Sequence, residues 1–137
     1  MFAVALWSCG NKSNEQDHDH HHEAAEVSGN QELYNKVMEI HDEVMPKMDD
    51  IRQFKSKLKD SLEKTTTLTA AERAQINALL AKLDSAGDGM MIWMREFRPL
   101  PDSLGEEKAR EYLENEMERV KRVKENINSA LKEAGKQ

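Results

Sequence analysis

The sequence predicts an all-α protein, an antiparallel three-helix bundle of long, coiled-coil-like helices that follows an N-terminal tether. Three observations predict it. Charged residues make up 34% of the 137-residue chain and aromatic residues only 5%, a balance typical of exposed helices with a narrow apolar seam. From residue 31 onward, apolar residues recur at steps of three and four, the period of a helix face. Short polar or proline-containing stretches separate three such runs, which favours helices that fold back on one another.

The first helix is expected over residues 31–64. Its apolar positions share one face, and charged residues fill the opposite side. These positions are Leu33, Val37, Ile40, Val44, Met48, Ile51, Phe54, Leu58 and Leu62. Pro46 interrupts the run and has no N–H to donate, so we expect a local kink there. A new helix starting at this point is the less favoured interpretation, because Met45 is a poor N-cap residue.

The second helix is expected over residues 70–98. Thr69, followed three residues later by Glu72, has the spacing of a capping box, which marks a helix start. The apolar positions are Ile76, Leu79, Leu83, Ala86, Met90, Met94 and Phe97. Two glycines, Gly87 and Gly89, fall inside this run, and each costs about 1 kcal/mol relative to alanine. The apolar register continues through them, which favours one helix over a break with a separate short helix capped by Asp88.

The third helix is expected over residues 104–134. The prolines in residues 99–101 end the preceding helix, and Ser103 with Glu106 repeats the capping-box spacing. The apolar positions are Ala109, Tyr112, Leu113, Met117, Val120, Val123, Ile127, Leu131 and Ala134. Gly135 then ends the helix.

The N-terminal residues 1–9 end in Leu6-Trp7-Ser8-Cys9. This order of an aliphatic, a variable, a small residue and a cysteine resembles the lipobox of bacterial lipoproteins, in which the cysteine is lipidated. A chance cysteine after an apolar run is the alternative. The eight residues before Cys9 include no lysine or arginine, whereas a signal peptide has a basic start. We therefore expect that the true start lies upstream or that the sequence is truncated.

Residues 10–30 are expected to form a disordered tether, because they hold too few apolar side chains to offset the entropy of ordering. They carry five acids and one lysine. Imidazoles beside carboxylates on a flexible chain collect Zn(II), Ni(II) or Cu(II) loosely. The candidate ligands are His18, His20, His21 and His22. A hydrophilic spacer with incidental metal affinity, or a vector-derived tag, is the alternative.

A second candidate metal site consists of one histidine and five methionines on the first two helices. They are His41, Met45, Met48, Met90, Met91 and Met94. A hairpin centred near Thr67 places His41 level with Trp93, and Met45 level with Gly89. Thioether and imidazole ligands suit a copper or silver ion, Cu(I) or Ag(I), and Trp93 would shield it. The alternative is that flexible methionines fill irregular gaps in the core.

Enzyme motifs are absent from the sequence. It contains no Gly-rich phosphate loop, no His-Glu-x-x-His and no paired cysteines, and these are the motifs that carry phosphate, zinc and redox chemistry. We expect no enzyme, and a hydrolase using surface carboxylates ranks last. The net charge of −6 and the lack of a large basic face argue against nucleic acid. The helices are expected to bind a protein partner or to self-associate, unless the bundle uses its whole apolar seam internally.

Four segments together resemble the small His-rich helical lipoproteins of Bacteroidota, some of which carry the automatic label "viral A-type inclusion protein". The segments are the lipobox at Cys9, residues 17–23, residues 41–48 (His-Asp-Glu-Val-Met-Pro-Lys-Met) and residues 90–94 (Met-Met-Ile-Trp-Met). The resemblance covers most of the chain. It implies a helical protein held by lipid in the cell envelope, at the outer membrane on its periplasmic or surface face, and it implies no activity.

Overall fold

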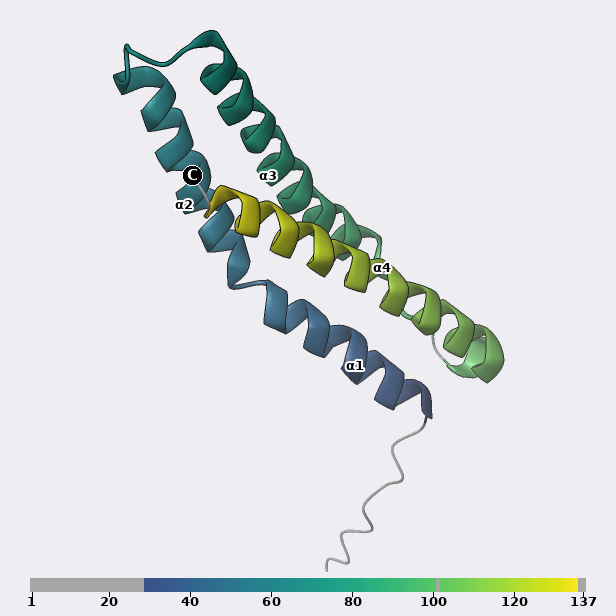
Figure 1. Cartoon of the computed structure of the whole chain (residues 1–137). Helices are drawn as coiled ribbons and strands as arrows, with labels where there is room; N and C mark the ends of the chain where they lie inside the picture. The colour runs from purple at the N-terminus through teal and green to yellow at the C-terminus, as the bar shows by residue number, and fades with distance from the viewer. Residues whose placement is uncertain (1–28, 101, 136–137) are drawn as a thin grey trace, which may run out of the picture.

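The structure, a computed structural model, describes residues 29–100 and 102–135 (Figure 1). These residues form an all-α bundle, as predicted, and no strand occurs among them. The elements are α1 (Gly29–Val44), α2 (Lys47–Lys64), α3 (Ala70–Glu96), the short 3-10 helix η1 (Asp102–Leu104) and α4 (Glu106–Ala134). The predicted lipidation site Cys9, the four tether histidines and the tether up to residue 28 lie outside the described residues.

Three rods of helix make up the bundle, and the first rod consists of α1 followed by α2. Figure 1 shows that α3 runs back along the first rod and that α4 returns beside it. The first rod changes its main partner along its length, because α1 packs mainly against α4 and α2 mainly against α3. Polar contacts join it to α4: Lys124 pairs with Glu43 at 2.5 Å, and Lys47 donates to the Asn128 side chain at 2.7 Å.

The first rod is broken at residues 45–46, where we expected only a kink within one helix. Pro46 keeps helical backbone angles (φ −59°, ψ −29°) but has no N–H to donate to the preceding turn. The chain instead makes two tighter bonds of 3.1 Å, from the amides of Met48 and Asp49 to carbonyls three residues back. Asp49 and Asp50 then place negative charge in the first turn of α2, which favours a helix start. Proline followed by acids is therefore the signal that identifies this second start.

The helix α1 begins at Gly29, two residues before the predicted start of the bundle. Asn30 is 4% exposed, and its side-chain amide donates to the carbonyl of Glu106 at 3.0 Å. This contact joins the first turn of α1 to the first turn of α4. Because it spans two distant segments, local composition did not reveal it, and residues 29–30 belong to the bundle rather than to the tether.

The predicted capping box at the start of α3 is confirmed. The amide of Glu72 donates to the Thr69 hydroxyl at 3.2 Å, and the amide of Thr69 donates to the Glu72 carboxylate at 2.7 Å. The helix then continues without a break through Gly87 and Gly89, as predicted. Arg73 donates to two carbonyls at the end of α2, each at 3.2 Å, and so fixes the turn between α2 and α3.

The start of α4 differs from the prediction. Ser103 lies in η1, and the N-cap residue is Gly105, which makes no side-chain capping bond. Gly105 has a φ of +118°, a conformation that residues with a Cβ rarely adopt. The chain therefore enters α4 through a glycine, and the capping box of Ser103 with Glu106 is wrong. The C-terminal end of α4 agrees with the prediction, since the helix stops at Ala134, just before Gly135.

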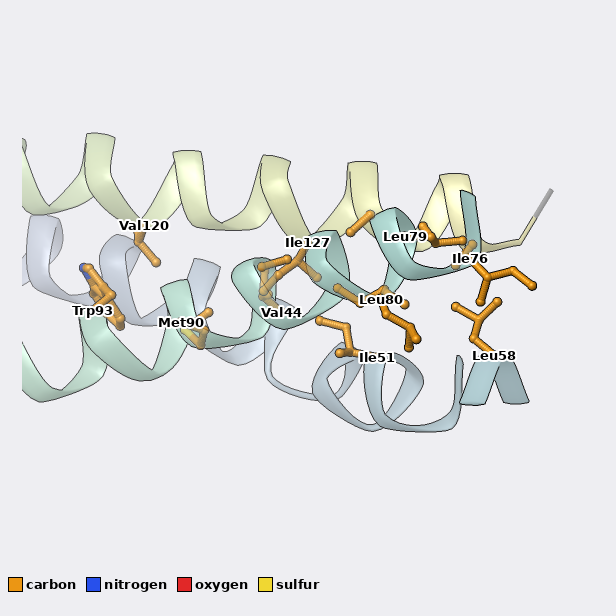
Figure 2. Close-up of a cluster of buried hydrophobic side chains, with 14 of the residues drawn as sticks. Val44, Ile51, Leu58, Ile76, Leu79, Leu80, Met90, Trp93, Val120 and Ile127 are labelled. Carbon is orange, nitrogen blue, oxygen red and sulfur yellow. The ribbon is translucent and has the colours of Figure 1, made fainter. Parts of the chain in front are cut away.

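The core runs along the bundle axis and thins toward the turn between α2 and α3. Figure 2 shows its side chains meeting between α3, α4 and the first rod. The largest fully buried side chains are Val37, Val44, Leu83, Met90, Val120 and Ile127. Near the turn, Leu58 and Ile76 keep 8% of their surface exposed. Figure 1 shows the reason, since the α2–α3 hairpin extends beyond the end of α4.

Candidate functional site

The predicted pairing of the first two rods is confirmed at His41 and Trp93. Their ring centroids lie 5.8 Å apart, with the rings tilted by 35°. Trp93 is 2% exposed and belongs to the core. The predicted register of the hairpin thus placed His41 of α1 and Trp93 of α3 at the same level along the bundle axis, although it did not predict the contact between their rings.

The structure distributes the five candidate methionines between core and surface. Met90 is fully buried, while Met45, Met48 and Met94 are half-buried and pack against the core. Met91, in contrast, is 43% exposed, so it does not join the others. Four of the five therefore contribute to packing, which is what flexible thioether side chains do at irregular helix junctions.

One ring nitrogen of the His41 imidazole contacts a carboxylate. Its Nδ1 lies 2.8 Å from the carboxylate of Asp42, and the side chain is 15% exposed. A carboxylate at Nδ1 favours the tautomer that carries its proton there. In that tautomer Nε2 keeps a free lone pair, which is the state in which histidine binds a metal.

An aromatic stack continues from Trp93 toward the end of α3. Trp93 and Phe97 lie 4.9 Å apart between ring centroids, and Phe97 also stacks on Tyr34 of α1 at 6.0 Å and on Tyr112 of α4 at 6.2 Å. The hydroxyl of Tyr112 accepts a bond from the amide of Arg98 at 2.6 Å. This stack joins all three rods. Tyr34 and Tyr112 lie at the helical spacing of the core positions. The apolar periodicity of the sequence is therefore the signal that locates them.

A carboxylate lies inside the bundle at the same end. Glu116 is 4% exposed, and its Oε1 accepts a bond from Arg119 at 2.8 Å. Arg119 also pairs with Glu96 of α3. The hydrogen bonds that Arg119 donates to Glu96 and then to Glu116 raise its pKa above the ordinary value. Glu116 stands between Leu113 and Val120 on the core face of α4, so helical periodicity alone indicates its burial.

Two buried polar atoms at this level lack a hydrogen-bond partner among the described residues. They are the indole nitrogen of Trp93 and Oε2 of Glu116. An unsatisfied buried donor or acceptor costs about 1–3 kcal/mol. These two unsatisfied atoms therefore lower the stability of this end of the bundle.

Within residues 29–100 and 102–135 there is neither a cluster of acidic, histidine or cysteine metal ligands nor a membrane-spanning helix. No group of three or more His, Cys, Asp or Glu side chains is placed to hold a metal ion. None of the helices described is long and apolar enough to cross a membrane.

Comparisons with known proteins add no relative. No family model, no curated protein and no solved structure matches the chain.

Proposed function

We propose that this protein is a lipid-anchored helical module of the bacterial cell envelope that binds a partner or supports a structure without catalysing a reaction. The observation that carries the proposal is the sequence Leu6-Trp7-Ser8-Cys9 followed at once by a polar segment. Lipid on Cys9 anchors the chain. Several acyl chains hold a protein far more firmly than one, which alone gives marginal binding.

The position of the bundle relative to Cys9 supports this proposal. The helices begin at Gly29, so residues 10–28 separate the anchor from the bundle. An extended chain of that length reaches at most about 60 Å. The bundle can therefore contact partners at the membrane surface or at some distance from it.

The test compares two single substitutions in the chain expressed in bacteria behind a signal-peptide start that carries basic residues. Cys9→Ala removes the thiol, whereas Ser8→Ala keeps a small residue before it and serves as the matched control. We expect the native protein and the Ser8→Ala variant in the membrane fraction, with the mass of attached lipid on Cys9. The Cys9→Ala variant should move to the aqueous fraction. Membrane retention of Cys9→Ala, or an unmodified Cys9 in the full chain, would contradict the proposal.

A second candidate function is the handling of Cu(I) or Ag(I). The observation that favours it is the contact of His41 Nδ1 with Asp42, because metal-binding histidines commonly donate their other ring N–H to a carboxylate. Its ligands would be His41 with thioethers among Met45, Met48, Met90 and Met94, and Met91 is excluded by its exposure. The tether histidines His18, His20, His21 and His22 would deliver or buffer ions, including Zn or Ni.

This second function is tested by Cu(I) titration against a competing chelator. The full chain is used with Cys9 and the four tether histidines replaced by alanine, so that neither the thiol nor the tether imidazoles compete with the bundle for Cu(I). Met90→Leu removes a thioether while conserving volume, and Met91→Leu is the matched control on the surface. We expect Met90→Leu to weaken binding at least tenfold and Met91→Leu to leave it unchanged. Equal affinity in both variants, or affinity no higher than that of a generic methionine peptide, rejects the site.

A further inference from the structure

The exposed large apolar side chains gather toward one end of the bundle. Among the described residues they are Met91, Ile92, Leu100 and Leu104. The first two lie near the end of α3 and the other two in the α3–α4 turn, where Leu104 is 63% exposed. In the opposite turn, residues 65–69, the leucine at position 68 packs against the core. The surface of the bundle is therefore more apolar at the α3–α4 turn than at the α2–α3 turn.

The start of α1 lies at this same end. The side-chain amide of Asn30 donates to the carbonyl of Glu106 at 3.0 Å, and Glu106 follows Leu104 by two residues. Figure 1 shows α1 beginning beside the α3–α4 turn, with the α2–α3 turn at the far end of the bundle. The chain that leads back to Cys9 therefore joins the bundle next to the exposed leucines.

The aromatic stack lies directly behind the α3–α4 turn. Tyr34, Phe97 and Tyr112 are half-buried there, and Phe97 precedes Leu100 by three residues. Tyrosine side chains are enriched where proteins meet the lipid–water interface, because each has an apolar body and a polar tip. This end thus combines exposed leucines with the aromatic side chains that suit such an interface.

The charges around the turn favour an apolar contact over an electrostatic one. Residues 98–110 contain three acidic and three basic residues, and Arg110 pairs with Glu106. A surface without net charge gains little from anionic headgroups, which attract clusters of lysine and arginine. Burial of the leucines away from water is therefore the interaction that this end can offer.

We propose that the α3–α4 turn is a membrane-contact surface that inserts Leu100 and Leu104 into the lipid interface. The inference rests on the proposed lipid anchor, because a contact made by two leucines is weak unless the chain is already held close to the membrane. Lipid is the occupant because the chain from the anchor enters the bundle beside these leucines.

The test places residue 9 at a membrane by chemistry, independently of native lipidation. The thiol of Cys9, the only cysteine of the chain, is coupled to a maleimide lipid in phosphatidylcholine vesicles. Trp7→Phe removes the indole next to the anchor. In that background Leu104→Trp reports on the α3–α4 turn and Thr66→Trp on the opposite turn, while the buried Trp93 adds the same signal to both. We expect brominated phosphatidylcholine to quench Leu104→Trp at least about twofold more than Thr66→Trp, because only the first enters the interface.

Two further substitutions are made in the Leu104→Trp chain. Leu100→Asp puts a charge into the contact and should reduce quenching to the level of Thr66→Trp. Thr67→Asp adds the same charge at an exposed position of the opposite turn and should leave quenching unchanged. Circular dichroism checks that both remain folded.

Four outcomes would overturn the proposal. They are equal quenching at the two turns, quenching that survives Leu100→Asp, quenching that requires anionic lipid, and a blue shift of Leu104→Trp that grows with protein concentration in the absence of vesicles. The last would show that protein rather than lipid covers the turn. Because the anchor is made chemically, a Cys9 that bacteria leave unlipidated would contradict the proposed function without changing these measurements.

Discussion

Arg119 of α4 joins two carboxylates of very different exposure, since it pairs with Glu116 inside the bundle and with Glu96 on the surface of α3. The Glu116 side chain is 5% exposed, whereas that of Glu96 is 55% exposed. The buried carboxylate therefore depends on one guanidinium for its charge balance. Glu116 lies one helical turn after Tyr112, which belongs to the aromatic stack.

The first prediction concerns this ion pair. Arg119→Ala leaves Glu116 buried without a counter-charge and should lower the free energy of unfolding by about 2 kcal/mol. Glu116→Leu replaces the buried charge with an apolar side chain and should change stability by less than about 1 kcal/mol. Urea unfolding followed by circular dichroism measures both. Arg110→Ala, which breaks an exposed pair with Glu106, is the control, and a loss there as large as for Arg119→Ala would contradict the prediction.

The second prediction concerns the cap of α3. Thr69→Ala removes the acceptor of the Glu72 amide and should cost about 1 kcal/mol in the free energy of unfolding. Thr66→Ala, in the same turn and exposed, should cost less than about 0.5 kcal/mol. Thermal unfolding of the two variants, measured side by side, tests this difference in stability. Equal melting temperatures would show that the capping box adds nothing to stability.

The third prediction concerns pH. Hydrogen bonds from the backbone and then the side chain of Thr69 lower the pKa of Glu72. Because the folded pKa lies below the unfolded value of about 4.3, the contribution is present above that value and is lost as pH falls through the folded pKa. Glu72→Gln should therefore be less stable than the native protein at about pH 7, with the difference shrinking below about pH 4. Glu63→Gln, another exposed carboxylate, is the control and should show no such convergence.

The fourth prediction concerns the uneven core. Leu83 is fully buried where three rods meet, and Leu83→Ala should cost about 3 kcal/mol or more. Leu62 is half-buried near the turn between α2 and α3, and Leu62→Ala should cost about 1 kcal/mol. Amide hydrogen exchange should likewise be faster near this turn than around Leu83. A similar loss in the free energy of unfolding for both variants would mean that the α2–α3 turn is as well packed as the centre of the bundle, and would contradict the prediction.

Local signals predicted much of the fold. The apolar periodicity of α3 continued through Gly87 and Gly89 because two glycines weaken a helix without removing its hydrogen bonds. The capping box at Thr69 succeeded, whereas the same spacing at Ser103 failed. The difference is that η1 occupies the position of Ser103 and leaves Gly105 as the N-cap. A capping motif thus predicts a helix start only where the chain before it is free to be extended.

The placement of the candidate metal ligands was predicted in part, whereas metal binding itself stays a prediction. Counting residues from the turn at Thr67 placed His41 level with Trp93, because antiparallel helices with the same rise per residue keep their register. It did not predict that Met91 lies on the surface, although Met91 is one residue from the buried Met90 and consecutive residues of a helix point in different directions. The burial of Glu116 was not predicted either, because a charged side chain favours solvent even at a core position of the helical pattern.

The sequence by itself determined the three rods, their apolar faces and the start of α3, because periodicity and capping act over a few residues. Only the tertiary structure decided that the first rod passes from α4 to α3, that Arg119 links the enclosed Glu116 to Glu96, and that Tyr34 and Tyr112 both stack on Phe97 across the bundle. These features depend on which helix faces meet and how far each rod extends. Those relationships arise from packing between residues far apart in the chain, which no local pattern records.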